Sequence, residues 1–261
     1  MIYITGDTHG PKSIGFNSVD GVLHRFNSNN FPEQKNMTKN DYVIILGDFG
    51  CIWNVDNESS SEKNVLDWLD DKSFTTLFID GNHENFDRLY NYPEKQWHNG
   101  KVHEIRNSVL HLMRGYVFNI DNKNIFAFGG ASSHDIKDGI LHPKNDLKLI
   151  KRWKHDYTKQ FRILNYTYWE LELPTKYEMD RGINSLKCND FDVDFILSHS
   201  PSSSTIDILG NNNYKHDILT DYLENIKNTT KYKYWFCGHM HINKKISDKE
   251  IILYEQIIRI N

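Results

Sequence analysis

The sequence predicts an α/β protein. Short apolar segments such as Thr76–Asp80 are typical of buried strands, and polar side chains follow each of them directly. Over residues 41–80, a strand, an amphipathic helix and a second strand succeed one another, which is the order of a parallel βαβ unit. Because ligands bind at the carboxyl ends of strands in open α/β sheets, the residues that follow the strands are candidates for a functional site.

The composition is that of a globular protein. The chain has 261 residues, of which 38% are hydrophobic and 25% are charged, with a net charge of −4. This balance disfavours nucleic acid as a general partner. The three cysteines, Cys51, Cys188 and Cys237, form no CxxC pair, which suits a reducing compartment. Because no signal-peptide pattern or apolar span is present, we expect a cytoplasmic protein without a membrane partner; the oligomeric state stays open.

Strands and helices alternate in the first third of the chain. Strands are predicted over residues 2–5, 41–46 and 76–80. Ser59-Ser60-Ser61-Glu62 has the pattern of a helix cap and precedes an amphipathic segment that contains Val65 and Leu69. Short helices are expected over residues 22–26 and 85–90, and the rest of residues 10–40 is expected to be loop.

The rest of the chain begins with shorter strands. These are predicted over residues 102–105, 109–113, 116–120 and 124–129, with a hairpin turn at Asp121–Asn124. Helices are predicted over residues 146–153, 176–187 and 216–228, and buried strands over residues 192–197 and 232–237. Residues 244–260 are expected to form a closing hairpin around Asp248-Lys249.

Five strand ends carry side chains that bind metals. They are Asp7 with His9, Asp48, Asn82 with His83, His199, and His239 with His241. A single such pair is equally compatible with a polar turn. Together the nitrogen and oxygen donors suit Mn, Fe, Zn or Ni. They are too many for one tetrahedral zinc ion and match two ions that share a bridging carboxylate.

The order of these motifs resembles the calcineurin-like metallophosphoesterase superfamily. The motifs are Asp7-Thr8-His9, Gly47-Asp48, Gly81-Asn82-His83-Glu84, His199 and Gly238-His239-Met240-His241, and they span the chain. The stretches Gly47–Trp53, Gly81–Leu89 and Phe128–Ser132 are similar to small bacterial and phage members. The resemblance implies a four-layer α/β/β/α sandwich of two mixed β-sheets.

The resemblance also implies a metal centre and a reaction. One ion would be held by Asp7, His9 and His241, the other by Asn82, His199 and His239, and Asp48 would bridge both. Manganese is the favoured metal. A hydroxide that bridges the two ions would attack a phosphate mono- or diester, while His83 would give a proton to the leaving oxygen. Asp48 and His83 are therefore the expected catalytic residues, and a small phosphorylated substrate or a phosphoprotein is the expected partner.

At one position the residue differs from the one found in a branch of the resembling family. In the phosphoprotein phosphatases, the second motif continues to another aspartate, which orients the histidine of the third motif. Cys51 stands at this position, so the carboxylate partner of His83 is missing or comes from elsewhere. This departure disfavours a calcineurin-type protein phosphatase.

Three further residues are candidates for contacts with substrate. His134 follows the glycine pair Gly129-Gly130, and its alternative is a polar loop histidine. Arg88 and Arg114 are candidates for phosphate contacts, and their alternatives are charges on a helix surface and at a strand end.

The chain is expected to form a single domain, residues 1–261, with a lid-like insertion at residues 132–167. The insertion is rich in lysine and arginine and follows a strand that ends near the expected metals. A lid would attract anionic substrate to the cleft. The alternative is a solvated surface segment.

Two other functions remain open. A non-catalytic scaffold is known on the resembling fold, but this sequence has lost none of the expected ligands. A nuclease similar to the double-strand-break repair members is the other alternative, and those proteins usually bring additional DNA-binding domains.

Overall fold

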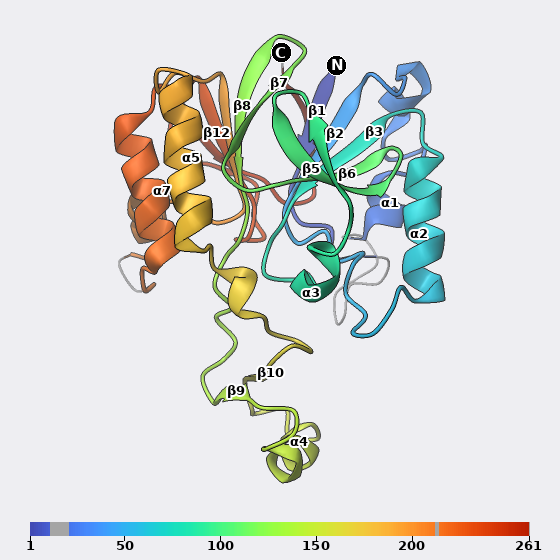
Figure 1. Cartoon of the computed structure of the whole chain (residues 1–261), viewed down its shortest axis with the longest axis vertical. Helices are drawn as coiled ribbons and strands as arrows, with labels where there is room; N and C mark the ends of the chain where they lie inside the picture. Colours follow the sequence, from blue (N-terminus) through green and yellow to red (C-terminus); the bar gives the residue numbers. More distant parts are fainter. Residues whose placement is uncertain (11–20, 212–213, 261) are drawn as a thin grey trace.

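Two large mixed β-sheets lie face to face, with helices on their outer sides (Figure 1). This computed structural model describes residues 1–10, 21–211 and 214–260, so the loop expected within residues 11–20 lies outside the described residues. Helices α5 (Lys176–Cys188) and α7 (Ile218–Thr229) cover the six-stranded sheet, and α2 (Ser60–Asp70) covers the seven-stranded sheet. The expected α/β fold with two mixed sheets is confirmed.

The seven-stranded sheet has the order β15-β1-β2-β3-β6-β5-β4. Its strands are β1 (Ile2–Thr5), β2 (Tyr42–Leu46), β3 (Thr75–Ile79), β4 (Glu94–Trp97), β5 (Gly100–Arg106), β6 (Val109–Leu112) and β15 (Ile257–Ile260). Strands β1, β2, β3 and β6 are parallel, so the carboxyl ends of β1, β2 and β3 share one edge. The strands predicted in the first third of the chain are confirmed to within a residue or so at either end.

The six-stranded sheet has the order β13-β14-β12-β11-β8-β7. Its strands are β7 (Tyr116–Ile120), β8 (Lys123–Phe128), β11 (Phe195–Ser198), β12 (Tyr234–Cys237), β13 (Lys244–Lys245) and β14 (Glu250–Ile252). Strands β8, β11, β12 and β14 are parallel. The hairpin turn between β7 and β8 is confirmed, with Asp121 and Asn122 in left-handed conformations at φ 50° and 58°.

Apolar side chains form three cores, one between the sheets and one under the helices of each outer side. Leu46 and Leu197 lie in the core between the sheets. The amphipathic segment of α2 places Val65 and Leu69 against the seven-stranded sheet. The predicted cap is present, because Ser59 Oγ accepts from the Glu62 N–H and the Glu62 carboxylate accepts from the Ser59 N–H.

The prediction of one closing hairpin over residues 244–260 is wrong. Only β13 and β14 pair as a hairpin, and β15 joins the other sheet, antiparallel to β1, with Ile260 opposite Ile2. The apolar side chains of β15 explain this, because Ile258 and Ile260 pack in the core between the sheets and Ile257 packs on the outer side.

The remaining elements are short. They are α1 (Val22–Arg25), η1 (Pro32–Asn36), α3 (Phe86–Leu89), β9 (Gly139–Leu141), α4 (Leu147–Trp153), β10 (Phe161–Ile163), η2 (Glu170–Glu172) and α6 (Ser203–Gly210). Of all these elements, β4, β9, β10, η1, η2 and α6 were not expected from the sequence. Among the described residues, no helix is both long and apolar enough to cross a membrane.

Residues 134–168 leave the two-sheet body as an arm (Figure 1). The arm contains β9, β10 and α4, and it projects away from the body at the end opposite the chain termini. Strands β9 and β10 pair in parallel, and no residue of α4 is buried. Because the arm follows β8, it begins at the edge where the parallel strands of that sheet end.

Candidate metal centre

The side chains expected to bind metal meet where parallel strands of both sheets end. Asp7 follows β1 and Asp48 follows β2, whereas His241 lies beyond the end of β12 in the other sheet. Four residues, Asp7, His9, Asp48 and His241, offer ligand atoms that all lie within 4.8 Å of one another. The structure therefore brings together residues that are up to 234 positions apart in the sequence.

The first half of the cluster pairs carboxylates with imidazoles. His241 Nε2 lies 3.1 Å from Asp7 Oδ2, and His9 Nε2 lies 3.3 Å from Asp48 Oδ2. The rings of His9 and His241 are 4.8 Å apart at their centroids. These are the residues expected around the first metal ion, together with the expected bridging carboxylate.

His199 and His239 lie outside this group of four and adjoin the other oxygen of Asp48. His199 Nε2 lies 3.4 Å from Asp48 Oδ1, and the ring of His239 lies 5.0 Å from the ring of His199. Asp48 therefore has one carboxylate oxygen towards His9 and the other towards His199. This is the position that a bridging ligand requires.

The surroundings of His199 are compatible with a bound cation. Its Nδ1 lies 2.6 Å from the carbonyl oxygen of Leu46, which can only accept, so Nδ1 carries a proton, and in the neutral ring Nε2 then presents a lone pair. Nε2 then faces the Asp48 carboxylate, which is also an acceptor. In the described part of the chain, buried His199 Nε2 has no hydrogen-bond partner, a state that costs about 1–3 kcal/mol. A divalent cation would satisfy both acceptors.

Asn82 shows the same feature from the third strand end. The residue is buried, and its Nδ2 donates to Ser133 Oγ at 3.4 Å. Its Oδ1 is buried and has no hydrogen-bond partner among the described residues. An amide oxygen is a ligand for hard divalent ions, so this orphaned atom fits the same kind of site.

Strained backbone surrounds the cluster. Four expected ligands adopt the left-handed conformation, which costs non-glycine residues about 1–3 kcal/mol each. They are His9 at φ 47°, Asp48 at 45°, His239 at 65° and His241 at 49°. Strain of this kind persists where the surrounding structure holds the backbone in place, and other turns of the chain, such as Asp121-Asn122, show it as well.

Glycines allow the backbone to approach the carboxylates. A Cβ atom on Gly81 would lie 2.1 Å from Asp48 Oδ1, and one on Gly238 would lie 2.4 Å from Asp7 Oδ1. In the absence of these Cβ atoms, the backbone N–H of His83, two residues after Gly81, and that of His239, directly after Gly238, donate to the carboxylates. The distances are 2.8 Å from His83 N to Asp48 Oδ1 and 3.0 Å from His239 N to Asp7 Oδ1.

Burial and neighbouring charges shift the pKa values of three residues at the site. Burial would raise the pKa of Asp48, but His199, His83 and His9 together hold it well below its ordinary value. Burial, reinforced by His199, lowers the pKa of His239 to about 3. Burial would lower the pKa of His9, but Asp48 and Asp7 raise it above its ordinary value. An ionised Asp48 and a neutral His239 are in the forms that coordinate metal ions, whereas His9 would have to release its proton to bind one.

His83 lies at the edge of the cluster. Its ring is 5.4 Å from the ring of His9 and 5.5 Å from that of Trp53. Burial lowers its pKa, and Asp48 opposes this shift. Asp135 and Arg162, at the base of the arm, also act on the pKa of His83 in opposite directions. Asp135 is itself paired with Arg162, whose Nη2 lies 2.7 Å from its Oδ2, and among the described residues no hydrogen bond joins it to His83 in place of the carboxylate that Cys51 cannot supply.

The three expected substrate residues have different surroundings. His134 is exposed and its ring lies 5.9 Å from that of His239, so it stands beside the cluster. The phosphate contact expected of Arg114 is wrong, because its guanidinium is fully buried and bound to Asp80, with Nε 2.8 Å from Oδ2. Its Nη2 also donates to the carbonyl of Leu171 at 2.8 Å.

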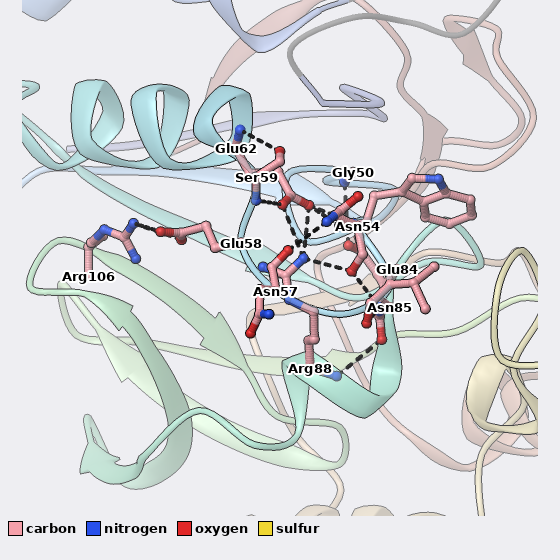
Figure 2. A network of polar contacts seen from close by, with 12 residues as sticks. Gly50, Asn54, Asn57, Glu58, Ser59, Glu62, Glu84, Asn85, Arg88 and Arg106 are labelled. Atoms are coloured by element: carbon pink, nitrogen blue, oxygen red, sulfur yellow. Dashed lines mark hydrogen bonds and ion pairs between the residues drawn. The ribbon is translucent and has the colours of Figure 1, made fainter.

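Arg88 is held in a network beneath the loop that follows β2 (Figure 2). Its Nη1 donates to Glu62 Oε1 at 3.0 Å and to the carbonyl of Asn54 at 2.9 Å. Its side chain is only 12% exposed. These contacts connect α3 with the start of α2, so Arg88 fills a structural role instead of the expected phosphate contact.

Sequence reasoning assigned no role to Glu84, which supports the metal cluster. It is fully buried, and its carboxyl group accepts from the N–H of Phe49 at 2.7 Å. It also accepts from the N–H of Gly50 at 3.4 Å (Figure 2). It thereby fixes the loop that carries Asp48. Its place directly after His83 was the available signal. Ser133 was also missed, although it adjoins the stretch Phe128–Ser132 that carried part of the resemblance.

These features define a class of protein: an α/β metalloprotein with carboxylates and imidazoles at strand ends shared by two sheets. The sequence model of the calcineurin-like phosphoesterases matches residues 1–243, and the chain belongs to this family. The expected resemblance is confirmed, and with it a metal-dependent phosphoesterase of the hydrolase class.

A curated relative is also similar. The lariat debranching enzyme of Schizosaccharomyces pombe (strain 972 / ATCC 24843) is 24% identical over 219 residues, which cover 78% of this chain and 43% of that protein. The chain therefore spans less than half the length of this relative.

Proposed function

We propose that the protein hydrolyses phosphate esters with two divalent metal ions, manganese being favoured. The first ion would be held by Asp7, His9 and His241, the second by Asn82, His199 and His239, and Asp48 would contribute to both. The observation that carries this proposal is the position of Asp48 between His9 at 3.3 Å and His199 at 3.4 Å. The orphaned donors Asn82 Oδ1 and His199 Nε2 support it.

The chain's own residues divide the chemistry between them. Bound divalent ions neutralise charge on a phosphoryl group and lower the pKa of water. Asp48 and its imidazole neighbours would fix the geometry, and the backbone N–H groups of His83 and His239 hold the carboxylates in place. His83, whose ring lies beside that of Trp53, would donate a proton to the leaving oxygen.

The substrate class follows from two observations. The structure offers no second aspartate at the Cys51 position, which disfavours a calcineurin-type protein phosphatase. The relative's name, a lariat debranching enzyme, favours a nucleotide ester over a phosphoprotein. We therefore propose a phosphodiester as the substrate, with monoesters as the alternative. All three cysteines are free, which supports work in a reducing compartment such as the cytoplasm.

Metal analysis and a substrate screen test this function. We expect two ions for each purified full-length chain and metal-dependent hydrolysis of bis-p-nitrophenyl phosphate, with p-nitrophenyl phosphate, cyclic nucleotides and phosphopeptides as competing substrates. Asp48→Asn should lower turnover by about 10²–10⁴-fold, because several kcal/mol of charge stabilisation are lost. It should also lower the metal content.

Asp71→Asn provides the matched control, because Asp71 is exposed and lies outside the cluster. It should retain both ions and full turnover. Two ions and normal turnover in Asp48→Asn would refute the dimetal assignment. Absence of both metal and hydrolysis in the wild type would favour a non-catalytic scaffold on the same fold.

A further inference from the structure

The charge of the protein is divided unevenly between the body and the arm. The whole chain has a net charge of −4, with 31 basic and 35 acidic residues. The arm, residues 134–168, contains eight lysines and arginines and four aspartates, a net charge of +4. The rest of the chain has 23 basic and 31 acidic residues, a net charge of −8. The overall charge therefore conceals a basic arm on an acidic body.

The basic side chains around α4 are free of acidic partners. Five of them are exposed: Lys144, Lys148, Lys151, Arg152 and Lys154. Within the described ranges, none of the five forms an ion pair, and α4 itself contains no acidic residue. By contrast, two other basic residues of the arm are paired, Lys159 with Asp138 and Arg162 with Asp135. The unpaired positive charge is thus concentrated towards the outer part of the arm.

Aromatic side chains accompany this charge. Tyr157 is 100% exposed and Tyr166 is 46% exposed. Trp153 packs edge-on against Phe161, with ring centroids 5.4 Å apart, which holds α4 against β10. Basic side chains interleaved with exposed aromatic rings are typical of surfaces that bind single-stranded nucleic acid, because the phosphates meet the cations and the bases stack on the rings.

The base of the arm touches the metal centre. Ser133, directly before the arm, accepts a hydrogen bond from Asn82. His134, its first residue, lies beside His239, with ring centroids 5.9 Å apart. The arm then projects from this edge of the body (Figure 1). A small ester at the centre would not reach α4, whereas a polymer of phosphodiesters would contact both.

We propose that the arm binds single-stranded nucleic acid and leads it to the metal centre. Delivery of the nucleic acid to the metal centre rests on the proposed function, whereas its binding by the arm does not. The overall charge disfavours nucleic acid as a partner only when the charge is taken as uniform. The separated charge favours an extended anion at the arm, and the exposed rings favour bases over the side chains of a phosphopeptide.

Binding is measured by fluorescence anisotropy with the full-length protein and a labelled 20-nucleotide single-stranded RNA or DNA. Chelator is present, so that no hydrolysis occurs. The test variant is Lys148→Gln/Lys151→Gln/Arg152→Gln/Lys154→Gln. We expect the Kd to rise at least about 10-fold. The slope of log Kd against the logarithm of the salt concentration should decrease by about 0.7 for each phosphate contact removed.

The matched control carries four lysine substitutions on the body. These are Lys35→Gln, Lys187→Gln, Lys231→Gln and Lys249→Gln, all at exposed positions. The change in net charge is the same as in the arm variant, so unchanged oligonucleotide binding in the control would assign the effect to the arm. An equal loss in both variants would overturn the proposal, because it would show attraction by overall charge.

A single aromatic substitution provides a second test of oligonucleotide binding by the arm. Tyr157→Ala should weaken binding by at least about 5-fold if a base stacks on this ring. Tyr177→Ala, on α5 of the body and 72% exposed, is its control and should bind as the wild type does. Wild-type protein that binds phosphatidylserine vesicles or a phosphopeptide but no oligonucleotide would also overturn the proposal.

The experiment separates this proposal from the proposed function. Hydrolysis of bis-p-nitrophenyl phosphate should be the same in the wild type and the arm variant, because α4 lies outside the cluster. If the wild type does not hydrolyse this ester but binds oligonucleotide through the arm, the proposed function fails and the binding surface stands. If the wild type hydrolyses the ester but does not bind oligonucleotide, the proposed binding surface fails and the proposed function stands.

Discussion

The side-chain amide of Asn82 donates a hydrogen bond to the hydroxyl of Ser133 at 3.4 Å. Asn82 follows β3 in one sheet and Ser133 follows β8 in the other, so this bond joins the two sheets beside the cluster. The backbone N–H of Ser133 in turn donates to Glu172 Oε2 at 3.2 Å. Because the amide nitrogen is occupied, the amide oxygen of Asn82 is held in a fixed orientation.

The first prediction concerns Ser133. Ser133→Ala should weaken binding of the second metal ion by about 10–100-fold, because the amide of Asn82 loses the partner that orients it. Titration of the metal-free protein with manganese, followed by calorimetry, measures this affinity. Ser185→Ala on α5, away from the cluster, is the control. Two ions bound with wild-type affinity in Ser133→Ala would show that this hydrogen bond does not orient the ligand.

The second prediction is a pH dependence of stability through Glu172. Burial raises the pKa of this carboxyl group to about 8 from an ordinary value of 4.5. Because the folded state favours the protonated form, the stability associated with it is present below pH 4.5 and is lost as the pH rises through about 8. Glu172→Gln mimics the protonated acid and should unfold at a higher temperature than the wild type at pH 8.5.

Thermal unfolding at pH 5, 7 and 8.5 checks this expectation. The advantage of Glu172→Gln should grow by several degrees between the lowest and the highest pH. Glu170→Gln alters an exposed carboxyl group two residues away and should show no such trend. Parallel curves for Glu172→Gln and the wild type would mean that Glu172 is ionised at neutral pH.

The third prediction concerns His83 and the leaving group. If this ring protonates the leaving oxygen, His83→Ala should lower kcat/KM for alkyl or nucleoside esters by about 10²–10⁴-fold. Esters of p-nitrophenol need little protonation and should lose far less. Since burial lowers the pKa of His83, its protonated fraction grows as the pH falls, and the effect on alkyl esters should be largest at acidic pH.

Metal content separates this role from a structural one. Both ions should remain in His83→Ala, and the exposed His98→Ala should match the wild type in all measurements. Equal losses on the two types of ester, independent of pH, would show that His83 positions the phosphate and transfers no proton.

The fourth prediction distinguishes the structural role of Arg114 from a phosphate contact. Arg114→Ala would leave the buried Asp80 carboxylate without its cation, which costs about 3–5 kcal/mol of stability. Denaturant unfolding measures this loss. The double variant Asp80→Asn/Arg114→Met should recover part of it, because both buried charges are removed. A raised KM with unchanged stability in Arg114→Ala would restore the phosphate contact.

Most strands could be predicted because each buried strand corresponds to a short run of apolar residues in the sequence. Tyr42–Leu46 and Thr75–Ile79 are buried at every position, and the polar residues that follow them mark the strand ends. The edge strand β4 could not be predicted in this way, because most of its side chains are exposed and its pairing with β5 gives no local pattern. The sheet that β15 joins likewise depends on its pairing with β1, which lies at the other end of the sequence.

The candidate site likewise contains some residues whose positions could be predicted from the sequence and others whose positions could not. The order of motifs correctly predicted that Asp7, His9, Asp48 and His241 would lie together. Arg114 is not part of these motifs, and its expected phosphate contact was wrong because the choice between substrate and the buried Asp80 depends on tertiary packing. The supporting atoms, such as the carbonyl of Leu46 beside His199, have no sequence signature, because every residue has a carbonyl group.

The antiparallel pairing of β1 with β15 has a consequence for biosynthesis. Ile2 lies opposite Ile260, and the cluster draws on residues from position 7 to position 241. A nascent chain therefore emerges from the ribosome with Asp7 and His9 long before His241 is available to join them. Loops of this length must close before the site exists, which carries an entropic cost and slows folding. Chains arrested before residue 241 would lack the complete group of four residues, so a metal ion that needs all four could bind only after the last of them has joined the fold.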